Sequence, residues 1–292
     1  MIDKEILKKI KRIEIVSKKV SEEIFAGQYH TAFKGKGLEF SEVREYYPGD
    51  DVRTIDWNVT SRTGKLFVKQ YIEERELRVI LAVDLSASLN FYSSQKSKKE
   101  IAAEISAIIA FTAMLNNDNV GLLVFTDKIE LFIPPKKGRT HLLRIIREIL
   151  EFKPENYKTN IENALEYLNT VMKKRSIIFL ISDFYDTNFE NAIKITSKKH
   201  DLIAINIFDK REVEIPNTGT FILKDLENNR EMLLDFSSLK TINNFKSKLN
   251  ALRSELDFIL KKHNVDLINI QTTKDYEKPL IKFFIKRKKR RI

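Results

Sequence analysis

Two aspartates follow apolar runs in the centre of the chain, and each stands beside hydroxyl side chains. Asp84 opens the sequence Asp84-Leu85-Ser86-Ala87-Ser88, and Asp183 follows Ser182. Carboxylate and hydroxyl oxygens suit a hard divalent cation such as Mg²⁺, which is typically held by one or two carboxylates and keeps several waters. Serine and aspartate are also ordinary loop and helix-capping residues, so the motif predicts a metal site only if the fold supplies further oxygen ligands.

The runs that precede the two aspartates have the length and β-branched composition of buried strands. Apolar residues at helical spacing follow the first run and stop at Asn116. The same alternation continues along the chain. Strands are predicted at 77–83, 120–125, 129–133, 176–182, 202–208 and 265–270, and helices at 98–115, 140–150, 161–172, 189–199 and 242–262.

This alternation predicts an α/β fold with a doubly wound, mostly parallel central sheet and helices on both faces. In such sheets ligands bind beyond the carboxyl ends of the strands, which is where Asp84 and Asp183 are expected. An amphipathic basic helix is expected from about Ile2 to Glu23, and the region beyond Pro216 predicts only short strands before the long helix.

Composition excludes several classes of function. The 292 residues contain no cysteine, so disulfides, thiolate zinc sites and cysteine nucleophiles are excluded. No signal peptide or membrane-spanning segment is recognisable, and we expect a cytoplasmic protein that is at most peripheral at the inner membrane. The net charge of +11 is due in part to the run from Lys286 to Arg291. Such a run contacts nucleic acid or an anionic membrane in some proteins, but a solvated terminus is the simpler interpretation.

The D-x-S-x-S loop, a later threonine and a later aspartate together resemble the metal-ion-dependent adhesion site of von Willebrand factor A domains. The matching residues are Asp84, Ser86, Ser88, Thr159 and Asp183. The resemblance implies that the three hydroxyls coordinate one divalent ion, Mg²⁺ or alternatively Mn²⁺ or Ca²⁺, while the aspartates bind it directly or through water. It also implies an open coordination position for a carboxylate of another protein. Asn160 stands where many members of the family carry an aspartate, and Thr159 is also a plausible helix cap.

A second resemblance covers most of the chain. Residues 35–57, continuing to Lys69, are similar to the signature of the bacterial domain-of-unknown-function family 58, in which such a segment precedes a von Willebrand A-like domain. Further matches are Glu73-Glu74-Arg75-Glu76, Asp118-Asn119-Val120-Gly121-Leu122, Pro134-Pro135-Lys136-Lys137-Gly138-Arg139 and Ser182-Asp183-Phe184. The resemblance implies association with a MoxR-type AAA+ ATPase and with membrane-anchored von Willebrand A proteins. We therefore expect three parts: 1–76, a helix and signature segment packed on the main domain; 77–272, the von Willebrand A-like domain; and 273–292, a helix and basic tail.

The charged side chains of the signature segment predict salt bridges around Trp57, with Pro48-Gly49-Asp50 forming a turn. We interpret the segment as a structural clasp with Trp57 as a core anchor, since a lone tryptophan beside Ile55 more often packs than recognises a ligand. The alternative is an acidic and aromatic docking surface for the ATPase.

Two other classes of function remain as alternatives. A metal-dependent hydrolase would need a nucleophile, a base or a phosphate loop, and no such motif is present. A basic nucleic-acid-binding protein would account for the isoelectric point near 9.5, but the sequence contains no recognised nucleic-acid-binding motif. We therefore expect a binding protein, with no catalytic or organic cofactor residues and no specific nucleic-acid partner.

Overall fold

The computed structural model describes residues 4–25, 39–72, 77–91, 93, 96–213, 219–224 and 231–290. The chain divides into two compact units, of which one is formed by Phe33–Glu76 and the other by Met1–Ala32 together with Leu77–Ile292. We call the first the signature unit and the second the main unit. Residues 26–38 and 73–76, which include the start of the signature and the Glu73 to Glu76 match, lie outside the described residues.

The main unit is built on a six-stranded sheet in the order β10-β7-β6-β3-β4-β5. Its strands are β3 (Arg78–Asp84), β4 (Asn119–Phe125), β5 (Ile129–Lys136), β6 (Ile177–Ser182), β7 (Asp201–Phe208) and β10 (Asp266–Gln271). Every neighbouring pair is parallel except β4 with the edge strand β5, which is antiparallel. The predicted architecture, a doubly wound and mostly parallel sheet, is confirmed.

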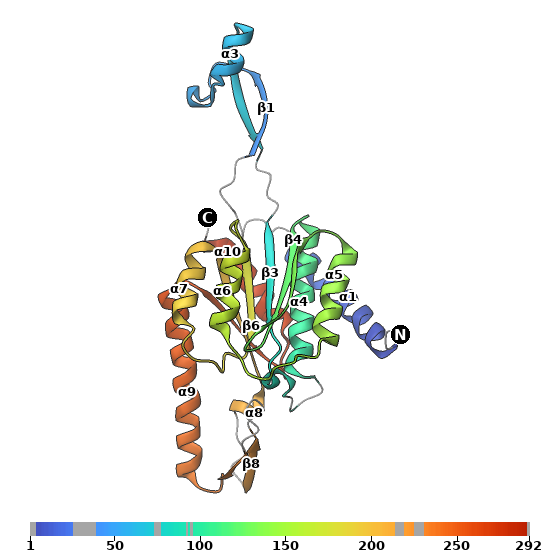
Figure 1. The fold of residues 1–292 in the computed structure, drawn as a ribbon, viewed down its shortest axis with the longest axis vertical. Coiled ribbons are helices and arrows are strands. Elements are labelled where there is room, and N and C mark those ends of the chain that lie inside the picture. Colours follow the sequence, from blue (N-terminus) through green and yellow to red (C-terminus); the bar gives the residue numbers. More distant parts are fainter. Residues whose placement is uncertain are drawn as a thin grey trace. The chain divides into compact units, whose positions relative to one another are not determined.

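Helices cover both faces of this sheet (Figure 1). The larger ones are α1 (Lys4–Phe25), α4 (Lys98–Leu115), α5 (Arg139–Glu151), α6 (Ile161–Val171), α7 (Glu190–Lys199), α9 (Leu239–Lys262) and α10 (Glu277–Arg290). Shorter elements are the 3-10 helix η2 (Ala87–Asn90), α8 (Lys210–Val213) and the hairpin of β8 (Thr220–Lys224) and β9 (Glu231–Asp235). Helices α6, α7 and α9 lie on one face, and α4 lies on the other with α1 and α5 beside it.

The strands are buried on both sides, which explains their continuous apolar sequences. Ile80 and Ala82 of β3 pack with Leu165 of α6 and Leu260 of α9, whereas the alternate residues of β3 face α4. All positions from Val79 to Asp84 are buried. The sheet is therefore a rigid support for whatever follows its carboxyl ends.

The compact units divide the chain differently from the three parts expected from the sequence. Helix α1 belongs to the main unit, where Ile13 and Val20 are buried and Ser21 Oγ donates to the carbonyl oxygen of Ile108 in α4 at 3.1 Å. Helix α10 belongs there too, because Leu280 and Phe284 are fully buried. The apolar faces of both helices complete the core, although periodicity alone does not show where they pack. The expected packing of the signature segment on the main domain stays a prediction.

The signature unit has its own small sheet. Strands β1 (Glu39–Glu45) and β2 (Phe67–Ile72) pair antiparallel, and between them lie the 3-10 helix η1 (Val52–Thr54) and α3 (Trp57–Thr63). Both Nη atoms of Arg44 donate hydrogen bonds to the Asp50 carboxylate, each at 2.7 Å. Lys65 pairs with Glu45, and Lys69 pairs with Asp56. Ion pairs of the expected kind are therefore present.

The expected role of Trp57 as a core anchor is wrong. Its side chain is 67% exposed. Asp56 caps α3 by accepting from the backbone N–H groups of Asn58 and Val59, which places Trp57 at the first helical position. The indole is therefore not held in a core by its apolar neighbour Ile55.

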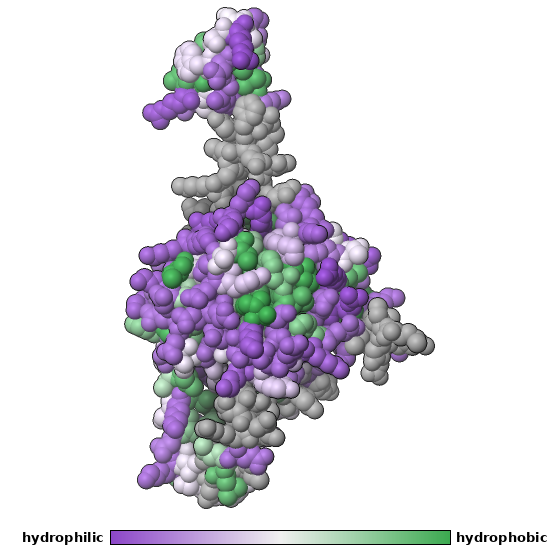
Figure 2. All heavy atoms as spheres, viewed as in Figure 1, coloured by the Kyte–Doolittle hydropathy of each residue, from purple (hydrophilic) through white to green (hydrophobic). Residues whose placement is uncertain are grey.

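Among the described residues, no helix is long and apolar enough to cross a membrane. Hydrophilic residues dominate the face of the main unit seen in Figure 2, with a hydrophobic area near its middle.

Candidate metal site at the carboxyl ends of the strands

Asp84 and Asp183 come from neighbouring strands. Asp84 ends β3 and Asp183 directly follows β6, and the parallel register places Val83 opposite Ile181. The carboxyl ends of parallel strands meet at the same edge, so the two carboxylates approach one another as the sequence predicts. The negative charge of Asp183 is one cause of the altered pKa of Asp84.

The Asp84 carboxylate is fully buried and accepts hydrogen bonds from neutral groups. Oδ1 accepts from the backbone N–H of Ser86 at 2.8 Å, and Oδ2 accepts from Ser182 Oγ at 2.7 Å and Thr159 Oγ1 at 3.4 Å. Burial, and secondly Asp183, raise the pKa of Asp84 to about 7, although the hydroxyl and amide donors act in the opposite direction. The fold thus holds a carboxylate where its charge is costly.

Ser86 and Ser88 present their hydroxyls to each other, with 3.0 Å between the two Oγ atoms. Neither hydroxyl caps a long helix. Ser86 precedes η2 without a side-chain capping bond, and α4 is capped by Ser97 in a capping box with Glu100. The capping role that the sequence left open for Ser88 is therefore taken by another residue.

Thr159 does not cap the helix that follows it. Helix α6 begins at Ile161, and Asn160 caps it by accepting from the backbone N–H of Asn163 at 2.8 Å. The Thr159 hydroxyl instead reaches Asp84. Asn160, the departure from the usual family pattern, thus has a structural role that leaves Thr159 at the candidate site.

Asp183 has a cationic partner that the sequence did not suggest. Lys98 Nζ donates to Asp183 Oδ2 at 2.9 Å and also pairs with Glu212 of α8. The Lys98 side chain is fully buried and lies over the ring of Tyr185, with Nζ 5.4 Å from the ring centroid. Burial lowers the pKa of Lys98, but the two carboxylates outweigh burial and the pKa is raised.

The backbone after Asp183 is strained. Phe184 has φ of 56°, in the left-handed region that a bulky side chain rarely adopts. Ser182 Oγ accepts from the Phe184 N–H at 3.0 Å and simultaneously donates to Asp84. Strain of this kind persists where surrounding contacts over-determine the backbone, typically at functional sites.

The structure therefore brings Asp84, Ser86, Ser88 and Thr159 together, and it places Asp183 beside them but bound to Lys98. Ser182, Lys98 and Glu212 were not predicted. For Lys98 the sequence held one signal, since a lysine in the first turn of a helix is unfavourable against the helix dipole unless acids surround it.

The donor set fits a divalent cation on chemical grounds. Within the described part of the chain, no group of three or more His, Asp or Glu side chains could hold a metal ion, and the side chains that contact Asp84 carry hydroxyl oxygens. Asp84 is a buried carboxylate whose partners are all neutral among these residues. An unpaired buried charge is unfavourable, and a cation held on the adjacent hydroxyls would neutralise it.

Comparison with known proteins assigns the family. The family described as "Protein of unknown function DUF58" matches residues 42–255, and the chain belongs to it. "Uncharacterized protein Rv1480" of Mycobacterium tuberculosis is 28% identical over 285 residues, which cover 96% of this chain and 89% of that protein. "Uncharacterized protein YeaD" of Bacillus subtilis is 25% identical over 109 residues, 37% of this chain and 25% of that protein.

Two solved structures are similar to part of the chain at low sequence identity. One is the conserved hypothetical protein BatB from Bacteroides thetaiotaomicron, with a TM-score of 0.46, 15% identity, and coverage of 73% of this chain and 99% of that one. The other is the SpRpn10 VWA domain, with a TM-score of 0.40, 10% identity, and coverage of 70% and 94%.

Proposed function

We propose that the chain is a metal-ion-dependent protein interaction module and not an enzyme. The observation that carries the proposal is the buried Asp84 carboxylate, surrounded by the hydroxyls of Ser86, Thr159 and Ser182. The Ser86, Ser88 and Thr159 oxygens would hold one divalent ion, Mg²⁺ in the first instance, with Asp84 and Asp183 binding it directly or through water. Such an ion would supply a Lewis-acidic position suited to a carboxylate oxygen of a partner protein.

Binding is favoured over hydrolysis by the positions of the histidines. Within the described residues, His141 contacts the Val120 carbonyl, His200 accepts from Ser176, and His263 pairs with Glu190. None of these three contacts the candidate metal site. Among the described residues, which leave out His30, the site therefore has no imidazole base that could activate a water or a hydroxyl.

The partner we propose is a MoxR-type AAA+ ATPase, with membrane-anchored von Willebrand A proteins as further members of the assembly. The choice follows from what the resemblance of residues 35–57 and the further matching segments to this family implies about its partners. The module would act in assembly or activation of a protein complex, on the cytoplasmic side and at most peripherally at the inner membrane.

The test is capture of the partner by the tagged chain in Mg²⁺ and in EDTA. A variant with Asp84→Ala, Ser86→Ala and Ser88→Ala should lose the ATPase, and EDTA should release it from the wild type. A Ser86→Ala, Ser88→Ala variant keeps the Asp84 carboxylate and isolates the hydroxyls. The matched control, Ser237→Ala with Ser254→Ala, removes two hydroxyls at exposed positions outside the signature segment. Equal recovery by the triple variant, with an unchanged melting temperature, would defeat the metal-bridged interaction.

A further inference from the structure

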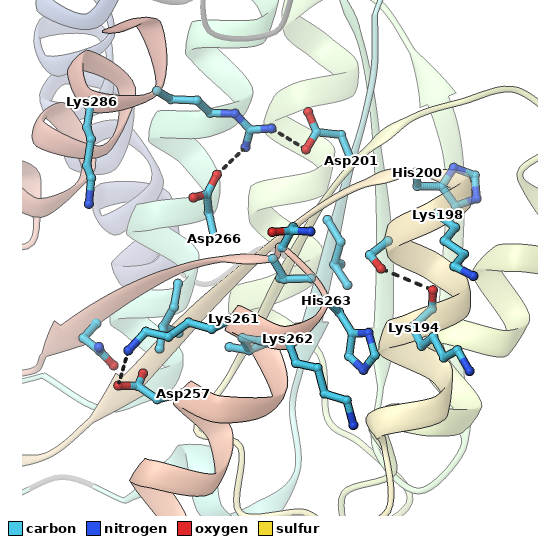
Figure 3. Close-up of a pocket in the computed structure, with 18 of the residues that line it drawn as sticks. Lys194, Lys198, His200, Asp201, Asp257, Lys261, Lys262, His263, Asp266 and Lys286 are labelled. Carbon is cyan, nitrogen blue, oxygen red and sulfur yellow. Dashed lines mark hydrogen bonds and ion pairs between the residues drawn. The ribbon is translucent and has the colours of Figure 1, made fainter. Parts of the chain in front are cut away.

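A basic hollow lies at the opposite ends of the strands, where β7 and β10 begin. It has a volume of about 780 Å³ and is formed by the carboxyl-terminal parts of α7, α9 and α10 together with Asp201 and Asp266. Figure 3 shows Lys194 and Lys198 of α7 near Lys262 and His263 at the end of α9. A hollow of this size accommodates a small ligand.

The charge of the lining is unbalanced. Seven Lys and Arg side chains line the hollow against three Asp, an excess of four positive charges when both histidines are neutral. The acids are already engaged: Asp201 and Asp266 pair with Arg287, and Asp257 pairs with Lys261. The carboxyl ends of α7 and α9 offset only about half a charge each, so most of the excess persists.

Four of these cations are exposed and form no ion pair with any residue that the structure describes. They are Arg175, Lys194, Lys198 and Lys286. Like charges gathered around a hollow repel one another, and an anion that enters it removes this repulsion. Arginine and lysine are the side chains that proteins use to bind phosphate groups.

His200 adds a buried donor to the wall of the hollow. The ring is 1% exposed, and its Nδ1 accepts from the backbone N–H of Ser176 at 3.3 Å, so the proton of the neutral ring is on Nε2. Among the described residues Nε2 has no hydrogen-bond partner. Burial lowers the pKa of His200 to about 4, so at neutral pH this part of the wall is uncharged and the positive charge of the hollow comes from its lysines and arginines.

We propose that this hollow binds a small soluble anion carrying several phosphate groups. None of the Phe, Tyr and Trp side chains that the structure describes lines the hollow, so it lacks the large rings on which nucleobases typically stack. The ligand class is therefore a polyphosphate or a polyphosphorylated small molecule and not a nucleic acid. The site is independent of the candidate metal site, because it is built at the opposite edge of the sheet from different residues.

Calorimetric titration of the full chain with tripolyphosphate, in EDTA and about 0.15 M salt, tests the proposal. We expect one saturable site that Lys194→Glu with Lys198→Glu weakens at least about tenfold, equivalent to about 1.4 kcal/mol. The control, Lys246→Glu with Lys248→Glu, makes the same change in net charge on exposed positions of α9 outside the hollow. It should bind as the wild type does.

Three results would overturn the proposal. They are equal weakening in the control, the absence of saturable binding, and preferential binding of an oligothymidylate or of anionic vesicles that the Lys194 and Lys198 changes abolish. Melting curves of both double variants should match the wild type, since all four lysines are exposed.

Discussion

Lys98 Nζ lies 2.9 Å from Asp183 Oδ2, and both side chains are fully buried although 85 positions separate them in the chain. The same ammonium pairs with Glu212, so two carboxylates share one positive charge. Asp84 lies outside this arrangement and is left with neutral hydrogen-bond donors. The candidate metal site thus contains one carboxylate that is paired internally and one that is not.

Lys98→Met should destabilise the main unit by about 3–5 kcal/mol, because it leaves two buried carboxylates without their cation. Urea unfolding followed by circular dichroism measures the change. Adding Glu212→Gln should restore part of the loss, since one of the two uncompensated charges is removed. Lys246→Met, on the exposed face of α9, is the control and should stay within about 0.5 kcal/mol of the wild type. An unchanged stability of Lys98→Met would contradict the buried pairing.

Asp84→Asn should stabilise the metal-free protein at pH 8, on the order of 2 kcal/mol. The reason is that the folded state raises the pKa of Asp84 to about 7, so that ionising this carboxylate at higher pH costs folding free energy. The hydroxyl of Ser182 can reverse its hydrogen bond to accept from the new amide. Denaturant titration in EDTA measures the effect.

Mg²⁺ should raise the melting temperature of the wild type and leave Asp84→Asn unchanged, because the variant lacks the charge that the ion neutralises. Asp257→Asn, which changes an exposed acid paired with Lys261, should respond to Mg²⁺ as the wild type does. A Mg²⁺ response of equal size in Asp84→Asn would place the ion elsewhere.

His200 should make the folded state less stable as the pH falls from about 6.5 to about 4. Burial, together with Lys199 and Arg175, lowers the pKa of His200 to about 4, so the unfolded chain binds the proton more readily in this interval. The contribution is fully present above the unfolded pKa and is lost as the pH falls towards the folded one, on the order of 3 kcal/mol in total. Unfolding free energies of the wild type and His200→Gln across this interval should converge towards low pH. Parallel curves would show that His200 is not the group responsible.

Trp57 should report a solvated environment. Because it is the single tryptophan of the chain and is 67% exposed, the intrinsic fluorescence should be red-shifted and readily quenched by acrylamide. Trp57→Ala should cost less than about 1 kcal/mol, compared with the 3–5 kcal/mol typical of a buried indole. Trp57→Phe gives the background signal without tryptophan. A blue-shifted, protected emission would mean that the indole is covered in solution.

The sequence by itself determined the sheet and the edge at which the site is found. The apolar runs that end at Asp84 and Asp183 have the length and β-branched composition of buried strands, and parallel strands bring their carboxyl ends together. Tertiary structure alone decided which partners these groups have. Lys98 pairs with Asp183, and Asn160 caps α6 so that Thr159 does not. The cations of the basic hollow come together because α7, α9 and α10 end close to one another. The periodicity of apolar residues shows which face of a helix or strand is buried. The pairing of charges depends instead on side chains that packing brings together from distant parts of the chain.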